Sequence, residues 1–292
     1  MGSSEGWECV VVGGGAAGLS AALVLGRARR RTLVLDSGGQ SNRAAAHVGG
    51  GLGLDGTLPD ALYAQGRAQL AAYDSVVIRD AEAVDARADG EDFVLALGDG
   101  ESEVRTRSLI LATGMDYEVP DVPGFREHWG GAVFHCPFCH GWEVRDRQLV
   151  VYAEDEMADR LEALARGWSD DVTTVDPAEV AELRADAGTV SALVRHDGSE
   201  VSCEAVLVHA PLRRRGRLAE SIGLNFTDAG LVAIDELGHT SVPGVYAAGD
   251  LAVAPQQVAI AIGSGHTAGL VATRELLLGR PAPLSEPNGD GT

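Results

Sequence analysis

The most constraining feature of the sequence is a strand, a glycine-rich turn, a helix and a second strand in direct succession near the N-terminus. Residues 8–12 form an apolar, strand-like run, and the turn reads GGGAAG from Gly13 to Gly18. An apolar helical stretch follows, and residues 31–36 form the second strand-like run. This order is that of a βαβ unit. The sequence therefore predicts an α/β protein.

The glycines of this turn have the spacing of a dinucleotide site. Gly13, Gly15 and Gly18 fill the three glycine positions of a G-x-G-x-x-G turn. Missing side chains there allow a tight turn, close approach of the backbone to a pyrophosphate, and close packing of the helix on the strand. The positive end of the helix faces the phosphates. Asp36 ends the second strand, where a carboxylate can accept hydrogen bonds from a ribose. A purely structural turn is the alternative.

Charge and hydropathy exclude several classes of partner. A formal net charge of -20 argues against nucleic-acid binding, which needs clustered cations. The short basic run from Arg213 to Arg215, with Arg217, is interpreted as a solvated loop. The N-terminus lacks the basic and apolar regions of a signal peptide, and no run of about 18 apolar residues occurs. We expect a cytoplasmic protein that binds neither nucleic acid nor membrane.

The cysteines divide into two isolated residues and one pair. Cys9 and Cys203 stand alone in strand-like stretches and are predicted to be buried thiols. Cys136 and Cys139 form a C-x-x-C motif, and the second such motif that a four-thiolate zinc site needs is missing. Pro137 suits the first turn of a helix, which places Cys136 at a helix N-terminus, where a thiolate is favoured. Redox use without a metal is predicted, with a structural disulfide as the alternative.

The rest of the chain indicates a second, smaller α/β unit. A length of 292 residues favours two domains. Strand-like runs occur at 148–152 and near 172–175, 190–195 and 204–209, with an apolar-periodic helix near 157–167. A long helical stretch is expected over about 256–278, and the polar tail at 283–292 is predicted to be disordered.

Three segments together resemble the low-molecular-weight thioredoxin reductase family. They are the glycine turn, the sequence ATG formed by Ala112, Thr113 and Gly114, and YAAGD ending at Asp250. The resemblance implies two Rossmann-like three-layer domains, the second reduced in size. Residues 1–116 and 241–292 would form a discontinuous FAD-binding domain, and 117–240 a degenerate pyridine-nucleotide-type domain that carries the C-x-x-C motif. A homodimer is usual in this family.

The same resemblance assigns roles to individual residues. FAD is expected to be the cofactor, with Asp250 near its ribityl or phosphate region. Gln257 and Val258 would present a helix N-terminus to the pyrimidine end of the flavin ring, where the dipole stabilises negative charge. Cys136 would be the exchanging thiol, and Cys139 the thiol that reacts with the flavin. Together with the glycine turn, Asp36 and the ATG segment, these residues complete the predicted site.

One departure from the family concerns the second nucleotide site. A thioredoxin reductase needs a second glycine turn after the C-x-x-C motif, but residues 152–156 read YAEDE. Side chains there would block the backbone approach, and Glu154, Asp155 and Glu156 would repel a pyrophosphate. The next strand also lacks an arginine cluster for a 2′-phosphate. A solvated helix start is the alternative interpretation, but in either case NADPH is poorly accommodated.

The redox motif itself, CPFCHGWE, is similar to that of thioredoxin-reductase-like dithiol oxidases, which close the disulfides of gliotoxin, holomycin and romidepsin. Thioredoxin reductases usually have Asp directly after the second cysteine, whereas this chain has His140. An imidazole titrates near neutral pH, so His140 can accept a thiol proton; a core histidine is the alternative. Whether His135 or Glu143 assists His140 is left open.

The expected function is therefore that of an FAD-dependent dithiol oxidase in antibiotic biosynthesis. Its substrate would be a small dithiol, such as a dithiolopyrrolone, and O2 would be reduced to H2O2. Two alternatives remain: a reductase of the same type that takes electrons from a protein donor instead of NADPH, and a non-enzymatic flavin redox sensor.

Overall fold

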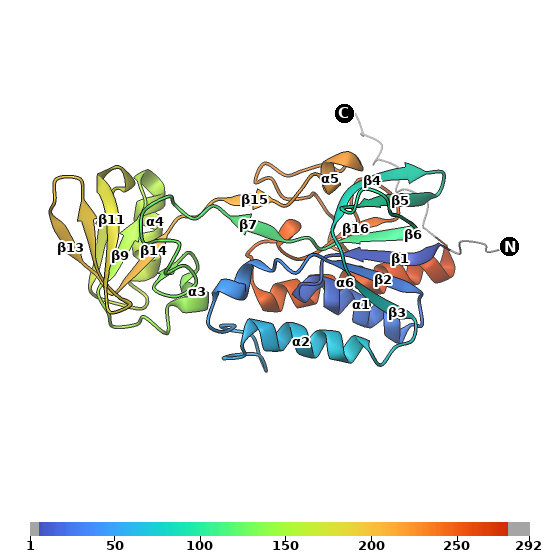
Figure 1. Ribbon diagram of the computed structural model, residues 1–292, viewed down its shortest axis with the longest axis horizontal. Coiled ribbons are helices and arrows are strands. Elements are labelled where there is room, and N and C mark those ends of the chain that lie inside the picture. Colours follow the sequence, from blue (N-terminus) through green and yellow to red (C-terminus); the bar gives the residue numbers. More distant parts are fainter. Residues whose placement is uncertain (1–5, 280–292) are drawn as a thin grey trace, which may run out of the picture. The chain divides into compact units, whose positions relative to one another are not determined.

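The computed structural model describes residues 6–279, so the tail predicted to be disordered lies outside the described residues. The chain packs into two compact units, whose elements are drawn in Figure 1. Unit 1 comprises the described residues of Met1–Gln40, Tyr63–Gly114 and Arg214–Thr292, and unit 2 comprises Ser41–Leu62 and Met115–Arg213. This division differs from the expected domain bounds because residues 41–62 pack with unit 2 and residues 214–240 with unit 1.

Unit 1 is built on a mostly parallel sheet with the strand order β3-β2-β1-β6. The other edge of β6 is shared, since its first half pairs with antiparallel β5 and its last residues pair with parallel β16. The bounds are β1 (Trp7–Val12), β2 (Thr32–Asp36), β3 (Val76–Asp80), β4 (Ala83–Asp89), β5 (Asp92–Leu97), β6 (Glu103–Leu111) and β16 (Val245–Ala247). The predicted βαβ unit is confirmed as β1, α1 and β2.

Helix α1 (Ala16–Arg27) packs along helix α6 (Val258–Leu278), and small residues set how closely they approach (Figure 1). A Cβ atom on Gly265 would lie 2.0 Å from the carbonyl oxygen of Ala17. One turn later, a Cβ on Gly269 would lie 2.7 Å from the carbonyl oxygen of Ala21. The glycines are therefore required by backbone contact between the helices. The long helix predicted over 256–278 is confirmed.

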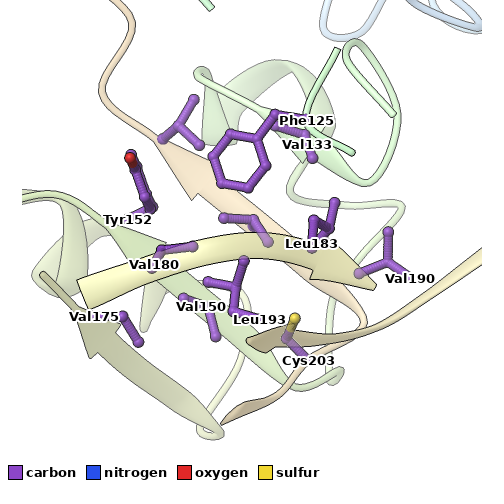
Figure 2. Close-up of a cluster of buried hydrophobic side chains, with 12 residues drawn as sticks. Phe125, Val133, Val150, Tyr152, Val175, Val180, Leu183, Val190, Leu193 and Cys203 are labelled. Carbon is purple, nitrogen blue, oxygen red and sulfur yellow. The ribbon is translucent and has the colours of Figure 1, made fainter. Parts of the chain in front are cut away.

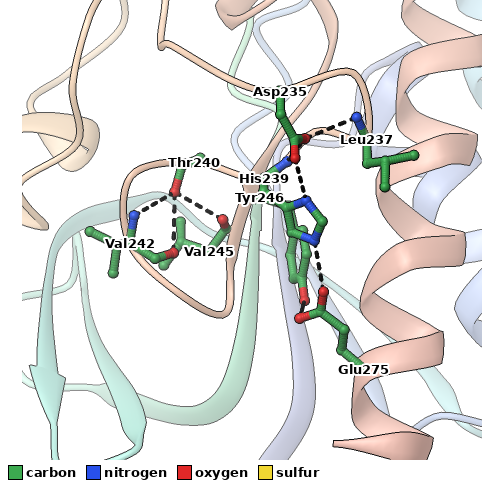
Figure 3. Close-up of polar contacts among 8 residues, drawn as sticks. All are labelled: Asp235, Leu237, His239, Thr240, Val242, Val245, Tyr246 and Glu275. Atoms are coloured by element: carbon green, nitrogen blue, oxygen red, sulfur yellow. Dashed lines mark hydrogen bonds and ion pairs between the residues drawn. The ribbon is translucent and has the colours of Figure 1, made fainter. Parts of the chain in front are cut away.

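A hydrogen-bonded histidine ties the loop before β16 to α6 (Figure 3). The Nδ1 of His239 lies 2.8 Å from Asp235, and its Nε2 lies 2.7 Å from Glu275. The buried hydroxyl of Tyr246 donates to the second oxygen of Glu275 at 2.6 Å. A neutral imidazole has only one N–H, so donation to both carboxylates requires the protonated ring. This arrangement is called the His239 clamp below.

Unit 2 contains a parallel sheet with the strand order β10-β9-β14-β8 and a three-stranded antiparallel sheet, β11-β12-β13. All of the strands predicted here from hydrophobic runs are confirmed, and the helix near 157–167 is α4. The bounds are β8 (Val133–Phe134), β9 (Leu149–Tyr152), α4 (Asp155–Ala165), β10 (Val172–Val175), β11 (Val180–Asp186), β12 (Thr189–Arg195), β13 (Glu200–Ser202) and β14 (Ala205–Val208).

The remaining elements are short. Strands β7 (Met115–Tyr117) and β15 (Leu212–Arg214) pair with each other. The short helices are η1 (Ser41–Ala44), α3 (Pro137–His140), η2 (Pro177–Glu179), α5 (Leu218–Ser221) and η3 (Gly249–Leu251), and the longer α2 spans Pro59–Leu70.

An apolar core joins the two sheets of unit 2 (Figure 2). Phe125 meets Tyr152 edge to face, with ring centroids 5.0 Å apart, a favourable aromatic geometry. Cys203 belongs to this cluster, and burial raises the pKa of its thiol to about 11. Burial also raises the pKa of the fully buried Cys9 in β1. The prediction that these two cysteines are buried thiols is therefore confirmed, since neither is a reactive thiolate at neutral pH.

Candidate active site

The glycine turn between β1 and α1 has the geometry of a phosphate cradle. Gly13 has a φ of +113°, and a Cβ there would lie 2.1 Å from the carbonyl oxygen of Ala112. A Cβ on Gly18 would lie 1.8 Å from the carbonyl oxygen of Gly13. Gly15 caps α1, and only the Gln40 side chain, at 3.8 Å, comes near its missing Cβ. Two positions are thus closed by backbone, while the helix start is open to a ligand.

Asp36 lies at the buried end of β2, beside this turn. Its carboxylate accepts hydrogen bonds from the backbone of Gly38 at 2.9 Å and from Gln40 at 3.1 Å, and it pairs with Arg67 at 2.8 Å. A Cβ on Gly14 would lie 2.1 Å from its Oδ2. The carboxylate is therefore held against the glycine turn, which is consistent with the predicted ribose role but does not test it.

The other predicted cofactor residues also lie in unit 1. Ala112, Thr113 and Gly114 directly follow β6, Asp250 lies in η3, Gln257 caps α6, and Val258 is the first residue of α6. Burial raises the pKa of Asp250 to about 6, and the positive charge of Arg215 opposes this rise. A half-buried carboxyl within the influence of a cation is suited to polar groups of a bound cofactor.

Arg215 was not foreseen, because the basic run was interpreted as a solvated loop. The structure instead places Leu212–Arg214 in strand β15. Arg213, whose side chain is 65% exposed, fits the solvated interpretation. Arg214 does not, since it pairs with Glu220 at 2.9 Å and lies 4.1 Å above the Phe226 ring. Arg215 acts on Asp250, so the run is divided among three environments.

The matching turn of unit 2, between β9 and α4, is built differently. Glu154 caps the helix, and Asp155 and Glu156 stand in its first turn, all three exposed. Asp155 has a φ of +52°, a left-handed conformation that glycine adopts more readily. These carboxylates complement the positive helix end themselves. The acidic turn is consistent with the predicted poor fit to a pyrophosphate but does not test it.

The C-x-x-C motif begins the single turn of helix α3. Cys136 is the N-cap residue and Pro137 the first helical residue, as predicted. The backbone N–H groups of Cys139 and His140 both donate to the carbonyl of Cys136 at 3.1 Å. Both cysteines are half-buried. The pair is thus partly accessible, in contrast to Cys9 and Cys203.

Residues 44–49 pack against this motif within unit 2. A Cβ on Gly49 would lie 2.4 Å from the carbonyl oxygen of Cys139, and a Cβ on Gly130 would lie 2.5 Å from the backbone of Ala44. This contact brings His47 to Glu143, with 2.9 Å between Nε2 and Oε1. His47 was not predicted, because the only signal for it is one histidine beside a glycine run far from the cysteines in sequence.

The two histidines that flank the cysteines lie in different environments. His135 lies against the rings of Tyr117 and Trp129, with centroids 3.9 and 5.5 Å away, and burial lowers its pKa to about 4. His140 stacks on Phe134 at 5.8 Å. Burial lowers the pKa of His140, while the charge of Glu143 raises it. His135 is therefore neutral at pH 7, and His140 has a carboxylate to assist protonation.

Two aromatic side chains beside the cysteines are exposed. Phe138, between the cysteines, is 62% exposed, and Trp142 is 66% exposed. Phe138 meets Trp168 edge to face at 5.4 Å, and the guanidinium of Arg145 lies 3.9 Å from the Trp142 ring. Each exposed ring is thus held by an intramolecular contact and presents apolar surface next to the redox motif.

This combination of fold and motif defines a disulfide oxidoreductase. Residues 7–153 and 142–265 match the family described as pyridine nucleotide-disulphide oxidoreductase, and the chain belongs to that family. Within it, the chain is a thioredoxin-reductase-like oxidoreductase of the flavoprotein type. The predicted family and the predicted fold of two Rossmann-like domains are confirmed.

Individual relatives match over nearly the whole chain. The thioredoxin reductase tcpT of Claviceps purpurea (strain 20.1) is 31% identical, over 95% of this chain and 96% of the relative. The thioredoxin reductase sirT of Leptosphaeria maculans is 32% identical, over 90% and 92%. Among solved structures, the chain is similar to HlmI, with a TM-score of 0.89 and 34% identity over 95% of this chain and 94% of that one.

Two further observations bear on metals and membranes. Among residues 6–279, no three His, Cys, Asp or Glu side chains are grouped as a metal site would require. In the same part of the chain, no helix combines the length and apolar character needed to span a bilayer.

Proposed function

We propose that the protein is an FAD-dependent dithiol oxidase that closes an intramolecular disulfide in a small-molecule dithiol, with O2 reduced to H2O2. The observation that carries this proposal is the contrast between two turns. The glycine turn at the start of α1 fits a dinucleotide, whereas the turn at the start of α4 presents Glu154, Asp155 and Glu156. A chain that holds a flavin but fits NADPH poorly needs another electron source.

The dithiol substrate is that source, and the C-x-x-C motif accepts its electrons. A dithiol that closes to a disulfide releases two electrons and two protons, which O2 takes up to form H2O2. A substrate thiolate attacks Cys136 in the oxidised pair, and the second substrate thiol then displaces Cys136, leaving Cys136 and Cys139 reduced. When bound, FAD supplies the two-electron acceptor that reoxidises the pair and the donor that reduces oxygen.

His140 is the proposed base for the incoming thiol. An ordinary thiol is mostly protonated at pH 7 and must lose its proton before it attacks. His140 follows Cys139 directly, and because burial lowers its pKa it is present as the neutral, accepting form at pH 7. His135 is also neutral, but its ring is enclosed by Tyr117 and Trp129. We therefore propose that His140, and not His135, accepts the proton of the incoming thiol.

The substrate class follows from the surface beside the cysteines. The exposed rings of Phe138 and Trp142 favour an apolar, planar molecule such as a dithiolopyrrolone dithiol. A net charge of -20 disfavours docking of an acidic protein electron donor. A role in antibiotic biosynthesis belongs to the proposal by resemblance to the dithiol oxidases, and a homodimer by resemblance to the thioredoxin reductase family. A cytoplasmic location is proposed from the sequence pattern.

The proposal is tested with the Cys136→Ser holoprotein. Under air, wild type is expected to consume O2 with dithiothreitol or a dithiolopyrrolone dithiol and to release one H2O2 per disulfide. Cys136→Ser is expected to keep its flavin and lose essentially all turnover, because the exchanging sulfur is gone. The matched control is Cys203→Ala, which removes a buried thiol outside the motif.

Three outcomes would contradict the proposal. Wild-type turnover in Cys136→Ser would remove the pair from the mechanism. Dithiol oxidation that requires an added protein acceptor, without peroxide, would favour the protein-coupled reductase. Bound flavin with no turnover of any dithiol would favour the redox sensor.

A further inference from the structure

Three titratable side chains of unit 2 meet beside the C-x-x-C motif, and only one of them has a role in the proposed reaction. They are His140, Glu143 and His47. Glu143 lies three residues after His140, and its backbone N–H donates to the carbonyl of His140 at 3.2 Å, which closes a turn. At this spacing two side chains lie on the same side of a turn. His47 arrives from the segment that Gly49 brings against Cys139.

One oxygen of Glu143 has a hydrogen-bond partner in this group and the other has none. The Oε1 of Glu143 lies 2.9 Å from the Nε2 of His47. The Oε2 of Glu143 is buried without a hydrogen-bond partner among the described residues. The ring of His140 lies near the backbone of Gly130 and Cys136, which favours its protonated form, but neither of its buried nitrogens makes a hydrogen bond of good geometry there. A buried polar atom without a partner is costly. Protonation of His140 makes both of its nitrogens donors, and Glu143 Oε2 is then a buried acceptor without a competing partner.

We propose that Glu143, fixed by His47, is the positioning carboxylate of His140 and accepts a hydrogen bond from its protonated ring. This inference rests on the proposed function, in which His140 takes the thiol proton. The S–H bond of the substrate breaks, its electron pair stays on sulfur, and the proton forms an N–H bond on His140. Glu143 and His47 exchange no proton with the substrate in this step, so neither is consumed.

The other groups around His140 are consistent with this role. Desolvation works against the imidazolium, and the charge of Glu143 opposes that effect. A charge on His47 disfavours the imidazolium, whereas the contact of its Nε2 with Glu143 Oε1 at 2.9 Å orients the carboxylate. His135 faces His140 as well and is neutral at pH 7. Among the described residues, Glu143 therefore has the largest effect in favour of the imidazolium.

The test measures the pKa of His140 directly in the flavin-loaded protein. The chain has 8 histidines, and the signal of His140 in NMR spectra of ¹³C-labelled histidine rings is identified by its loss in His140→Ala. Glu143→Gln keeps the shape of the side chain and removes its charge, and is expected to lower the pKa of His140 by about one unit. Glu143→Asp is expected to recover part of that shift. Glu127→Gln, at an exposed glutamate of the same unit, is the control and leaves the pKa unchanged.

Turnover gives a second readout for His47. His47→Ala is expected to slow dithiol oxidation about tenfold at pH 7, and His47→Gln, which keeps an N–H donor, to restore most of the rate. An unchanged His140 pKa in Glu143→Gln and Glu143→Asp would overturn the proposal. A shifted pKa in a protein that oxidises no dithiol would uphold the pairing of Glu143 with His140 and overturn only the oxidase function.

Discussion

The two units each start a helix directly after a parallel strand, but they treat the positive end of that helix in opposite ways. In unit 1, α1 has no acidic residue in its first turn, and Gly15 leaves the helix end open. In unit 2, α4 has Asp155 and Glu156 in its first turn. The first helix leaves its positive end for an external anion, and the second neutralises it with its own side chains.

This difference lies in the residues of two turns that have the same place after a parallel strand. Both turns follow a buried strand of a parallel sheet, and each contains a residue of positive φ: Gly13, at +113°, directly follows β1, and Asp155, at +52°, is the first residue of α4. The left-handed residue therefore stands at a different position in each turn. The side chains also differ, because only missing Cβ atoms and uncompensated N–H groups admit a phosphate.

The largest effect is expected from closing the first turn. In Gly18→Val, a Cβ would sit 1.8 Å from the carbonyl oxygen of Gly13, so the turn and helix must separate. We expect colourless protein and a loss of about 3 kcal/mol or more in the free energy of unfolding. Flavin absorbance measures the cofactor content, and denaturant unfolding measures the loss of stability. Gly263→Ala is the control, because its Cβ meets open space on α6. Equal flavin content in both variants would contradict the role of the glycine turn in binding the cofactor.

A smaller effect is expected from the His239 clamp, which gives unit 1 a pH dependence that the apolar core of unit 2 lacks (Figures 2 and 3). Burial opposes protonation of His239, but its hydrogen bonds to Glu275 and Asp235 outweigh burial and raise its pKa. A group with a raised folded-state pKa stabilises fully below the unfolded pKa of about 6.5, and this contribution is lost as pH rises through the folded value.

We therefore expect His239→Ala to cost about 1–3 kcal/mol at pH 6, chiefly because the buried Glu275 loses a charged partner. The cost shrinks as pH rises through the folded-state pKa of His239, because the wild-type ring then loses its proton too. Unfolding at pH 6 and at pH values above that pKa measures this, with the exposed His266→Ala on α6 as control. The rate of amide hydrogen exchange in α6 is expected to increase with pH by more than the intrinsic increase of amide exchange. In β12, only the intrinsic increase is expected. A cost that grows with pH would exclude the clamp.

The smallest effect separates charge from backbone strain at Asp155. Asp155→Asn removes the favourable charge at the helix end and is expected to cost about 0.3–1 kcal/mol. Asp155→Gly loses the same charge but relieves the left-handed conformation, by about 1 kcal/mol. The glycine variant is thus expected to be more stable than the asparagine variant in denaturant unfolding. The reverse order would show that the second turn does not retain the geometry of a glycine position.

The sequence predicted local structure well where one segment contains the whole signal. Strand β10 spans the predicted residues 172–175, and Cys136 caps a helix that begins at Pro137, because proline restricts the backbone there. Arg215 and His47 were missed, since the carboxylates they act on lie 35 and 96 residues away, counted from Asp250 and Glu143. Such partners are set by tertiary packing, which no local pattern contains.

The roles assigned to the cysteines, to His140 and to the flavin-binding residues remain predictions, as do the domain bounds inferred by resemblance. The structure gathers Cys136, Cys139 and His140 in unit 2 and the predicted cofactor residues in unit 1. Glu143, left open as an assistant of His140, gains a specific place from its contact with His47.

The most direct test of the account compares two reductants of the flavin in the absence of oxygen. Purified holoprotein is mixed with NADPH or with a small dithiol, and the bleaching of flavin absorbance is followed by stopped flow. The account predicts prompt bleaching by one equivalent of dithiol. With NADPH, bleaching is expected to be at least about 100-fold slower at equal concentration, as if about 3 kcal/mol of pyrophosphate binding were missing. Rapid, stoichiometric bleaching by NADPH would contradict it, because the acidic turn at Glu154 to Glu156 would then accommodate the nucleotide after all.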